Sequence, residues 1–427
     1  MPPSAGRLLT RSSLMRASDA LATSIATYAI PLLILTTTGS ASLTGVAFLL
    51  EWLPRLAAFT VGGPLVDRFR PDRVFRAATT ARAALFAAAA LALALLPSSG
   101  NTTTAVVMAV GATGGLLAQG SFVAVETAGA HASRAAGAQA HRVQSVQIGI
   151  DQGALLAGPL AGALLLTGGP AVMLTMVTAL SAAAAASTVP AEAATAPADG
   201  PAAVWPGLRT GWHTVRAIPA LAWLVTGLVA SNLAVAVTQA SSPITVLTDY
   251  GSSPLAVGTI WSAAGVASLG AVAATRRAVD RFGLWPVGAS AAATACAACL
   301  AAALAPGLGA YAVAIGVLMA GEGAITVVLR TLRSRLIPAA VFGSTLSVTI
   351  VLVVLPMPLA GALVAVLPAT DLPALLLACS LLQGLVMTVA FRGLRRHRAS
   401  YTPSVPPTPE PPAAAPSDEP DLALPLA

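Results

Sequence analysis

Lysine is absent from this sequence, and charged residues of any kind are scarce. Only 9% of the 427 residues are charged, whereas 56% are hydrophobic, and the mean hydropathy is +0.81. A soluble domain carries about 25% charged residues because it needs a hydrated surface, so a large soluble protein is excluded. Disorder over most of the chain is excluded as well, because disordered chains are poor in hydrophobic residues. The composition predicts a membrane protein with several spans.

Cysteines and enzyme motifs are equally sparse. The cysteines are Cys296, Cys299 and Cys379, and all three lie in apolar runs. The C-x-x-C spacing of the first two has no second pair and no nearby His, which favours small apolar helix residues over a metal or redox site. The sequence has no Gly-x-Ser-x-Gly elbow, phosphate-binding loop or His/Asp/Glu cluster. We therefore expect no enzymatic activity, no cofactor, no metal and no ATP coupling within this chain.

Hydrophobic runs long enough to cross a bilayer, which takes about 20 helical residues, recur along the whole chain. Twelve spans are expected, at 14–37, 43–66, 74–97, 103–128, 143–167 and 170–190 in the first half and at 220–247, 254–275, 284–305, 309–332, 342–367 and 371–393 in the second. The predicted fold class is an all-α membrane protein with twelve transmembrane helices in two pseudo-symmetric six-helix bundles.

The segments between and after the two groups of spans differ in composition. Glu192, Asp199 and several prolines, followed by Trp212 and Arg216, predict a linker that includes a short amphipathic helix. The proline-rich C-terminal tail is expected to be disordered. The predicted domains are an N-terminal bundle over 1–190, a cytoplasmic linker over 191–219, a C-terminal bundle over 220–393 and a cytoplasmic tail over 394–427.

Arginine is confined to one set of the expected connections. The connections 38–42, 98–102, 168–169, 248–253, 306–308 and 368–370 contain none, whereas those on the opposite side are rich in it. Positive residues stay on the cytoplasmic side during insertion, so both termini are expected there. This topology explains the net charge of +7 without a nucleic-acid partner. Arginine without lysine, together with abundant alanine, indicates a GC-rich bacterial genome, and hence a multi-pass protein of the bacterial inner (plasma) membrane.

A four-residue word occurs twice at matching places. Val66-Asp67-Arg68-Phe69 and Val279-Asp280-Arg281-Phe282 each follow the second span of a six-helix half, on the arginine-rich side. Paired halves are typical of secondary transporters built from repeats. With Gly63, the first copy resembles the signature between helices 2 and 3 of the major facilitator superfamily. The resemblance implies a conformational switch that ties the halves together at the cytoplasmic face; its residues would be Gly63, Asp67, Arg68, Asp280 and Arg281.

The fifth expected span carries a second resemblance, in the segment Gly158-Pro159-Leu160-Ala161-Gly162-Ala163. Drug–proton antiporters of the same superfamily have a Gly-Pro-x-x-Gly-Gly element in this helix. The resemblance implies export. Small residues at four-residue spacing also let helix backbones approach closely, which would serve an importer equally well. Gly158, Pro159 and Gly162 are thus expected to be helix-packing residues.

Ionisable residues within spans cost about 3 kcal/mol each on insertion scales, so they mark candidate functional sites. Glu51 and Arg55 are four residues apart and share a helix face, which leaves an ion pair and a functional role both open. Asp151 and Glu322 have no arginine within four residues on their own helices, and a partner from another helix is the alternative to an unpaired carboxyl. Burial without a cation favours the protonated form of a carboxyl, so either could couple transport to proton entry. The proton-coupling candidates are Asp151, Glu322, Glu51, Glu126 and Asp19.

Polar residues recur at helical spacing on several spans. This pattern predicts a hydrated cavity between the halves, because lipid does not tolerate polar helix faces. For any single residue, a hydrogen bond between helices is the alternative. The residues expected to line the substrate cavity are Tyr28, Arg55, Gln119, Gln147, Asn232, Gln239, Thr326 and Arg330.

The leading hypothesis is a monomeric, proton-coupled exporter of small amphipathic compounds, such as drugs or antibiotics, that works by alternating access. Its expected partners are a small-molecule substrate, protons and the lipid bilayer. A metabolite importer or facilitator is the alternative of the same class. A non-transporting membrane receptor or scaffold is the alternative of a different class, and a long soluble signalling domain would favour it. The 34 residues from 394 onward are too short and proline-rich to form one.

Overall fold

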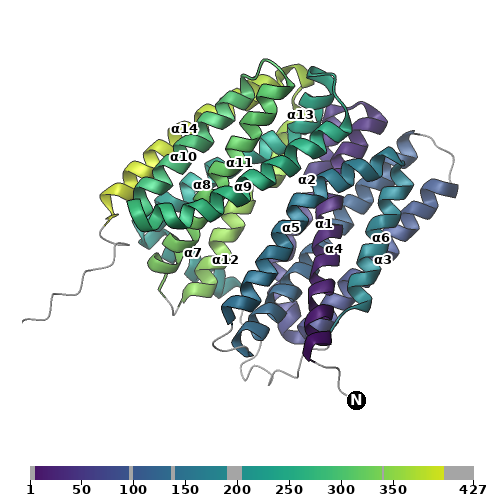
Figure 1. The fold of residues 1–427 in the computed structure, drawn as a ribbon, viewed down its shortest axis with the longest axis horizontal. Helices are drawn as coiled ribbons and strands as arrows, with labels where there is room; N and C mark the ends of the chain where they lie inside the picture. The colour runs from purple at the N-terminus through teal and green to yellow at the C-terminus, as the bar shows by residue number, and fades with distance from the viewer. Residues whose placement is uncertain (1–4, 96–99, 136–139, 190–203, 339–340, 399–427) are drawn as a thin grey trace, which may run out of the picture.

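The computed structural model describes residues 5–95, 100–135, 140–189, 204–338 and 341–398, and the side chains of a few helical stretches, including 59–69, lie outside the description. All the regular structure in these residues is helical, as the sequence predicts. Two groups of long helices lie side by side, purple to teal for the first half of the chain and teal to yellow for the second (Figure 1).

The first group contains six helices joined by short connections. They are α1 (Ala5–Thr38), α2 (Ala41–Phe69), α3 (Pro71–Leu95), α4 (Gly100–Ala135), α5 (Ala140–Thr167) and α6 (Pro170–Ala186). The turns between α1 and α2 and between α5 and α6 use Gly39 (φ 64°) and Gly169 (φ 97°). Positive φ values are readily adopted by glycine because it has no Cβ, so these residues allow antiparallel helices to follow one another closely.

A separate helix, α7 (Val204–Ala217), precedes the second group, in the region where an amphipathic helix is predicted. The second group consists of α8 (Pro219–Ile244), α9 (Pro254–Phe282), α10 (Leu284–Ala303), α11 (Leu308–Leu336), α12 (Phe342–Val354), α13 (Pro356–Val366) and α14 (Leu372–Arg396). Helix α8 continues as a π-helical turn over Thr245–Asp249. Helices α12 and α13 meet at Pro356, which has no N–H to continue the helical hydrogen bonding.

Ten helical segments of the described residues are long and apolar enough to cross a membrane, and α12 and α13 together count as one of them. Every expected span overlaps a helix, but two of the twelve are not among these ten segments. Helix α6 is apolar but has only 17 residues, and the side chains at the end of α2 are outside the description. Large apolar side chains such as Leu95, Val366 and Leu385 point outward, with 73%, 82% and 65% of their surface exposed, as suits a lipid environment.

The two halves meet closely at their arginine-poor end. Helix α2 contacts α13, where Ser42 Oγ donates a hydrogen bond to the carbonyl of Ala365 and a Cβ on Gly361 would lie 2.5 Å from the Leu49 nitrogen. Helix α5 contacts α9, where Ser262 Oγ accepts a hydrogen bond of 3.1 Å from the Leu160 nitrogen. The first contact brings backbone against backbone and the second is a hydrogen bond between the halves, so this end of the molecule is shut.

Helices α5 and α9 separate toward the arginine-rich end. Gly149, Gly153 and Leu156 lie along one face of α5 because they are spaced by about one helical turn. Leu156 still packs on Gly265 of α9, but a Cβ placed on Gly153 or Gly149 would meet no atom of the described residues within 4 Å. The halves therefore form a wedge that is closed at the arginine-poor end and parted along this face at the other.

Replacing Gly361 by valine is expected to open the closed end. The added Cβ would collide with the backbone of α2 rather than with a flexible side chain, so the conformation shown here becomes less populated. Spin labels are placed at Thr37 and Ala369 after the three native cysteines are replaced by alanine. The distance between the labels, measured by double electron–electron resonance, should be longer in Gly361→Val than in the parent protein. Gly316→Val is the matched control, since a Cβ at Gly316 meets no atom within 4 Å. Equal distance distributions in the two variants would contradict the prediction.

Candidate functional site

The charged residues of α2 form a buried cluster with α1. Arg55 donates a hydrogen bond of 2.7 Å to Glu51 Oε1 and another of 2.7 Å to Thr27 Oγ1 of α1. The Arg55 guanidinium also lies 4.8 Å from the centre of the Trp52 ring. Glu51 is 1% exposed. The pair of residues four apart is therefore an ion pair in the core of the first half, which neutralises both charges.

Several polar atoms of this cluster lack a hydrogen-bond partner among the described residues. They are Glu51 Oε2, Trp52 Nε1, Arg55 Nε and, from α4, Gln119 Nε2. Three of the four are donors and one is an acceptor. Buried polar groups are normally satisfied, so this cluster has spare hydrogen-bonding capacity for water or for a polar ligand.

Among the described residues of the first half, Arg82 of α3 is the arginine whose three guanidinium nitrogens all donate hydrogen bonds to side chains, and it is not among the site residues predicted from the sequence. It is 2% exposed and donates to Asp19 Oδ1 of α1 at 2.6 Å, to Thr23 Oγ1 of α1 at 2.9 Å and to Ser181 Oγ of α6 at 2.9 Å. Asp19 is thereby neutralised. The only sequence signal was an arginine well inside a predicted span, and such an arginine requires a partner.

Asp151 is paired with an arginine of another helix, which is the alternative that the sequence left open for it. Arg16 of α1 donates to both oxygens of Asp151 on α5, at 2.8 and 2.5 Å, and also to Glu126 of α4. The Asp151 and Glu126 side chains are 37% and 49% exposed. Asp151 is neither deeply buried nor without a cation, because its partner comes from a helix far away in the sequence. One arginine is thus shared by two carboxylates.

Glu322 of α11 has a different environment. Its Oε1 accepts a hydrogen bond of 2.5 Å from Ser231 Oγ of α8, and Ser231 Oγ in turn accepts one of 2.9 Å from Gln383 Nε2 of α14. Ser231 and Gln383 are fully buried, and Glu322 is partly buried. Among the described residues, no arginine or histidine forms an ion pair with Glu322. Of the five proton-coupling candidates, Glu322 alone is held entirely by neutral groups in this part of the chain.

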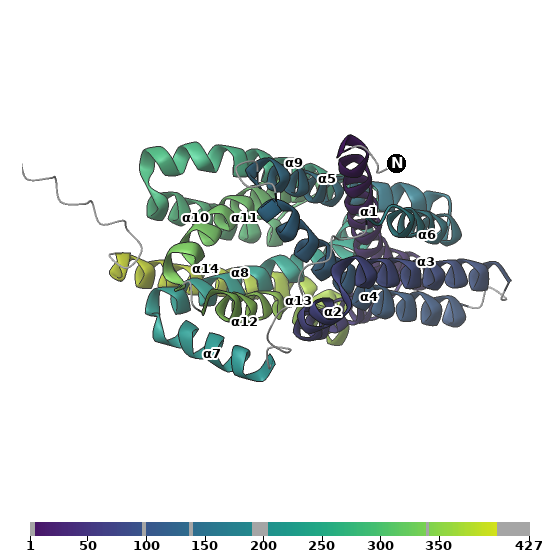
Figure 2. The ribbon, with the colours of Figure 1, turned by 90° about the horizontal axis from the view of Figure 1, so that it is seen from below.

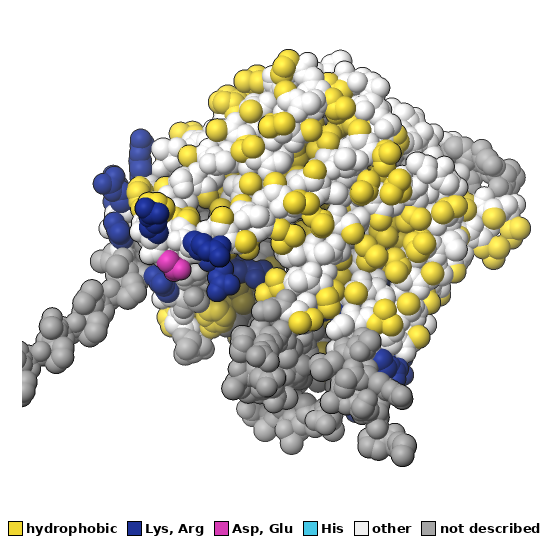
Figure 3. All heavy atoms as spheres, viewed as in Figure 1, with side chains coloured by type: hydrophobic (Ala, Val, Ile, Leu, Met, Phe, Trp, Pro, Cys, Tyr) yellow, Lys and Arg dark blue, Asp and Glu magenta, His cyan; other side chains and the backbone are white. Residues whose placement is uncertain are grey.

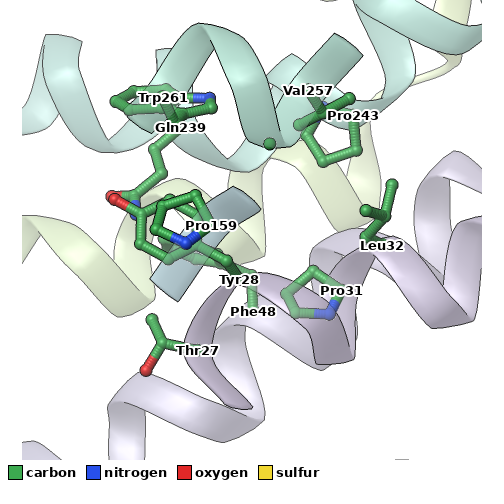
Figure 4. A pocket seen from close by; sticks show the side chains of 11 residues that line it. Thr27, Tyr28, Pro31, Leu32, Phe48, Pro159, Gln239, Pro243, Val257 and Trp261 are labelled. Carbon is green, nitrogen blue, oxygen red and sulfur yellow. The ribbon is translucent and has the colours of Figure 1, made fainter. Parts of the chain in front are cut away.

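A narrow pocket lies between the halves, close to their shut end (Figure 4). Tyr28 of α1 and Trp261 of α9 face each other with ring centres 6.1 Å apart, and Gln239 of α8 lies beside them. Trp261 Nε1 donates to Ser242 Oγ at 2.9 Å. Each of the two long helices has a proline here, Pro31 within α1 and Pro243 within α8. Tyr28 and Gln239, two of the residues expected to line the substrate cavity, thus border the same pocket, and their role in binding a substrate remains a prediction.

The remaining cavity candidates are placed less centrally. Gln147 packs on Gly129 of α4, and Asn232 donates to the carbonyl of Leu228 on its own helix at 3.0 Å. Thr326 likewise bonds to the carbonyl of Glu322 at 2.9 Å, while Arg330 is exposed one turn further along α11. For Asn232 and Thr326, hydrogen bonding within the helix is what the structure shows.

The glycines of α5 fit against α1. A Cβ on Gly158 would collide with Ser24, and one on Gly162 would lie 3.2 Å from the Cβ of Ala29. The carbonyl of Pro159 lies 2.6 Å from where a Cβ on Gly258 of α9 would be. This stretch of α5 therefore packs tightly on its own half and on the other half at once.

The fold and sequence together match a known family. The family model described as Major Facilitator Superfamily matches residues 13–360, which is most of the chain. The chain belongs to this superfamily. The family and its transporter neighbours indicate a small-molecule transporter in a membrane rather than an enzyme. A search of curated proteins finds no match.

Solved structures with the same fold are distant in sequence. A bacterial homologue of the iron transporter ferroportin in the inward-facing state has a TM-score of 0.70 and 15% identity, with 91% of this chain and 100% of that one covered. The outward-facing state of a bacterial ferroportin homologue has a TM-score of 0.61 and 15% identity, with 92% and 99% covered. The nucleoside transporter NupG has a TM-score of 0.69 and 13% identity, with 91% and 99% covered.

Within this superfamily member, the expected switch residues are only partly described. Gly63, Asp67 and Arg68 belong to the last turns of α2, and their side chains lie outside the described residues. In the second copy, Asp280 and Arg281 are exposed at the end of α9, and the Arg281 guanidinium lies 5.3 Å from the Phe282 ring. The role of these five residues remains a prediction.

Proposed function

We propose that the chain is a proton-coupled exporter of small amphipathic compounds and that Glu322 takes up and releases the proton. One observation carries this assignment. Asp19, Glu51, Glu126 and Asp151 each pair with an arginine, whereas Glu322 is held by Ser231. A carboxyl with only neutral neighbours can exist charged or neutral without leaving an arginine uncompensated. This is the property that a proton carrier needs.

The transport cycle that we propose is alternating access by two six-helix bundles, with α2 and α6 completing twelve spans and both termini in the cytoplasm. The arginine-rich end is then cytoplasmic. Because the halves are shut at the opposite end, this conformation is inward-facing. The higher TM-score against the inward-facing ferroportin homologue than against the outward-facing one, 0.70 against 0.61, supports this proposal. As in the sequence-based hypothesis, the location is the bacterial inner membrane and the protein acts as a monomer.

Export and an amphipathic substrate are supported by two features. The Gly158-Pro159 segment resembles the element of drug–proton antiporters, and it packs on both α1 and α9 where the halves close. Between the halves lie the aromatic rings of Tyr28 and Trp261 with the amide of Gln239. Apolar rings with a few polar groups suit a compound that has both characters.

A vesicle assay tests the proposed function directly. Proteoliposomes with a defined pH gradient are loaded with a panel of fluorescent cationic amphiphiles. The orientation of the inserted protein is determined from the accessibility of the tail to an added protease. We expect the pH gradient to drive the compound from the side of the arginine-rich end to the side of the arginine-poor end, which is the direction of export. Gradient-driven movement inward would indicate an importer, gradient-independent movement a facilitator, and no movement of any tested compound a receptor or scaffold.

Substitution of Asp151 by asparagine is expected to lower proton-driven transport by no more than about twofold. Arg16 keeps Glu126 as a partner in this variant, so no charge is left uncompensated, and surface ion pairs contribute only about 0–1 kcal/mol. The rate of gradient-driven transport in vesicles, normalised to the amount of inserted protein, measures the effect. Loss of most of the transport rate in Asp151→Asn would contradict this prediction and indicate that Asp151 is the proton carrier.

A further inference from the structure

Helix α7 lies at the level where the spans begin. Its last residue, Ala217, is separated only by Ile218 from α8, whose apolar span starts at Pro219. Near its middle, Gly211 packs so closely on α12 that a Cβ there would collide with the carbonyl of Ser344, the first residue of another span. The chain connection and this contact place α7 beside the first residues of two spans, at the arginine-rich end.

Helix α7 also lies at the outer edge of the helix assembly. Seen from below, α7 lies beside α12 at the edge of the second half (Figure 2). Its free side therefore faces the surrounding membrane surface rather than the space between the halves.

The two faces of α7 differ in chemistry. Gly211 and Val215 are buried against the protein, whereas Arg209, Trp212 and Arg216 form an exposed stripe at i, i+3 and i+7. The Trp212 side chain is 44% exposed, and the Arg216 guanidinium lies 5.9 Å from its ring centre. Helix α7 itself carries no acidic residue.

The surroundings add positive charge. Arginines gather at the lower, arginine-rich end of the second half, while its flank is apolar (Figure 3). Among the described residues at that end of the second half, Asp280 near the end of α9 is the only carboxylate. The stripe on α7 therefore has no acidic partner of its own within the described protein.

We propose that the Arg209–Trp212–Arg216 stripe of α7 is a binding site for the headgroups of anionic phospholipids in the membrane that holds the protein. Tryptophan is stabilised at the headgroup level because one edge of its ring is apolar and the other carries an N–H. Arginine forms paired hydrogen bonds to phosphate. An amphipathic helix with basic residues beside an aromatic anchor is the arrangement that binds anionic membrane surfaces.

Lipid capture by the full-length protein tests the proposal. The protein is placed in nanodiscs of phosphatidylcholine with increasing phosphatidylglycerol, and bound phosphatidylglycerol is counted by native mass spectrometry after release. The variant with Arg209→Gln and Arg216→Gln should bind phosphatidylglycerol about 30-fold more weakly, which corresponds to about 1 kcal/mol for each arginine. Binding to the wild type should weaken with added salt, because exposed charges are screened.

The matched control removes the same number of exposed arginines elsewhere. Arg276→Gln with Arg277→Gln, on α9, should leave the binding close to that of the wild type. Equal losses in the two double variants, or no loss in either, would overturn the site. As a second readout, brominated phosphatidylglycerol should quench the fluorescence of Trp212, seen as the difference between the wild type and Trp212→Phe. If aqueous acrylamide quenches Trp212 in phosphatidylglycerol membranes as strongly as in phosphatidylcholine, the stripe faces water or a soluble partner, and the proposal fails. None of these measurements requires transport.

Discussion

Glu322→Gln is expected to abolish the gradient-driven transport while leaving the protein folded and inserted. Glutamine has nearly the shape of glutamate and can still accept the hydrogen bond from Ser231 Oγ, so the link between α11 and α8 is kept. What it cannot do is gain and lose a proton. The measurement is the initial rate of substrate movement in vesicles with an imposed pH gradient, and the expected decrease is at least about 100-fold, since uphill movement requires the coupled proton.

Substrate exchange without a gradient separates coupling from binding. If Glu322 serves only as the proton carrier, Glu322→Gln should still exchange labelled for unlabelled substrate across the membrane at near the wild-type rate. Glu126→Gln is the matched control, because it removes a carboxyl from a pair in which Arg16 keeps Asp151. Uphill transport by Glu322→Gln at the wild-type rate would refute the assignment. Loss of exchange together with uphill transport would instead place Glu322 in the substrate site.

The environment of Glu322 makes a further, smaller effect measurable. Ser231→Ala removes the hydrogen bond that favours the charged form of the carboxyl, and Gln383 then loses its partner as well. Proton release from Glu322 becomes harder, so the pH at which transport reaches half its maximum should rise. The arginines on the same helix, Arg330 and Arg333, lie two or more turns away and are unchanged in this variant. The pH profile of the initial transport rate measures the shift, and an unchanged profile would mean that Ser231 has only a packing role.

The position of most helices could be predicted from hydropathy alone. The expected span 284–305 is helix Leu284–Ala303, and the expected span 170–190 begins at the first residue of α6. Apolar length and the prolines and glycines at the ends are local properties, so they can be read from one stretch of sequence. The number of spans is less secure, because the 17 residues of α6 are shorter than the usual length of about 20.

The pairing of the charges could not be predicted in the same way. Arg16 and Asp151 are 135 positions apart, and Arg82 and Asp19 are 63 apart. Hydropathy does not fix how each helix is rotated about its axis, and that rotation decides which charges meet. Only the Glu51–Arg55 pair was evident, because residues four apart on one helix meet regardless of the packing. Asp151 and Glu322 are therefore alike in sequence pattern, although among the described residues Asp151 pairs with an arginine and Glu322 does not.

Removal of Arg82 is expected to have the largest effect on folding. Arg82 joins α3 to α1 and α6 through three hydrogen bonds, and without it the Asp19 carboxylate would remain buried with no cation. Breaking a buried pair from one side costs about 3–5 kcal/mol. Arg82→Ala should therefore lower the midpoint of thermal unfolding in detergent sharply and reduce the amount of protein inserted in the membrane.

Two further variants distinguish an uncompensated charge from lost packing. Arg76→Ala removes an exposed arginine from the same helix and should leave the unfolding midpoint unchanged. The double variant Arg82→Met with Asp19→Asn removes both charges while it keeps most of the volume. Because no charge is then left buried without a partner, it should recover much of the lost stability. If the double variant is as unstable as Arg82→Ala, the hydrogen bonds to Thr23 and Ser181 contribute more to stability than the ion pair does. Arg82 would then stabilise the fold mainly by linking α3 to α1 and α6 through these hydrogen bonds.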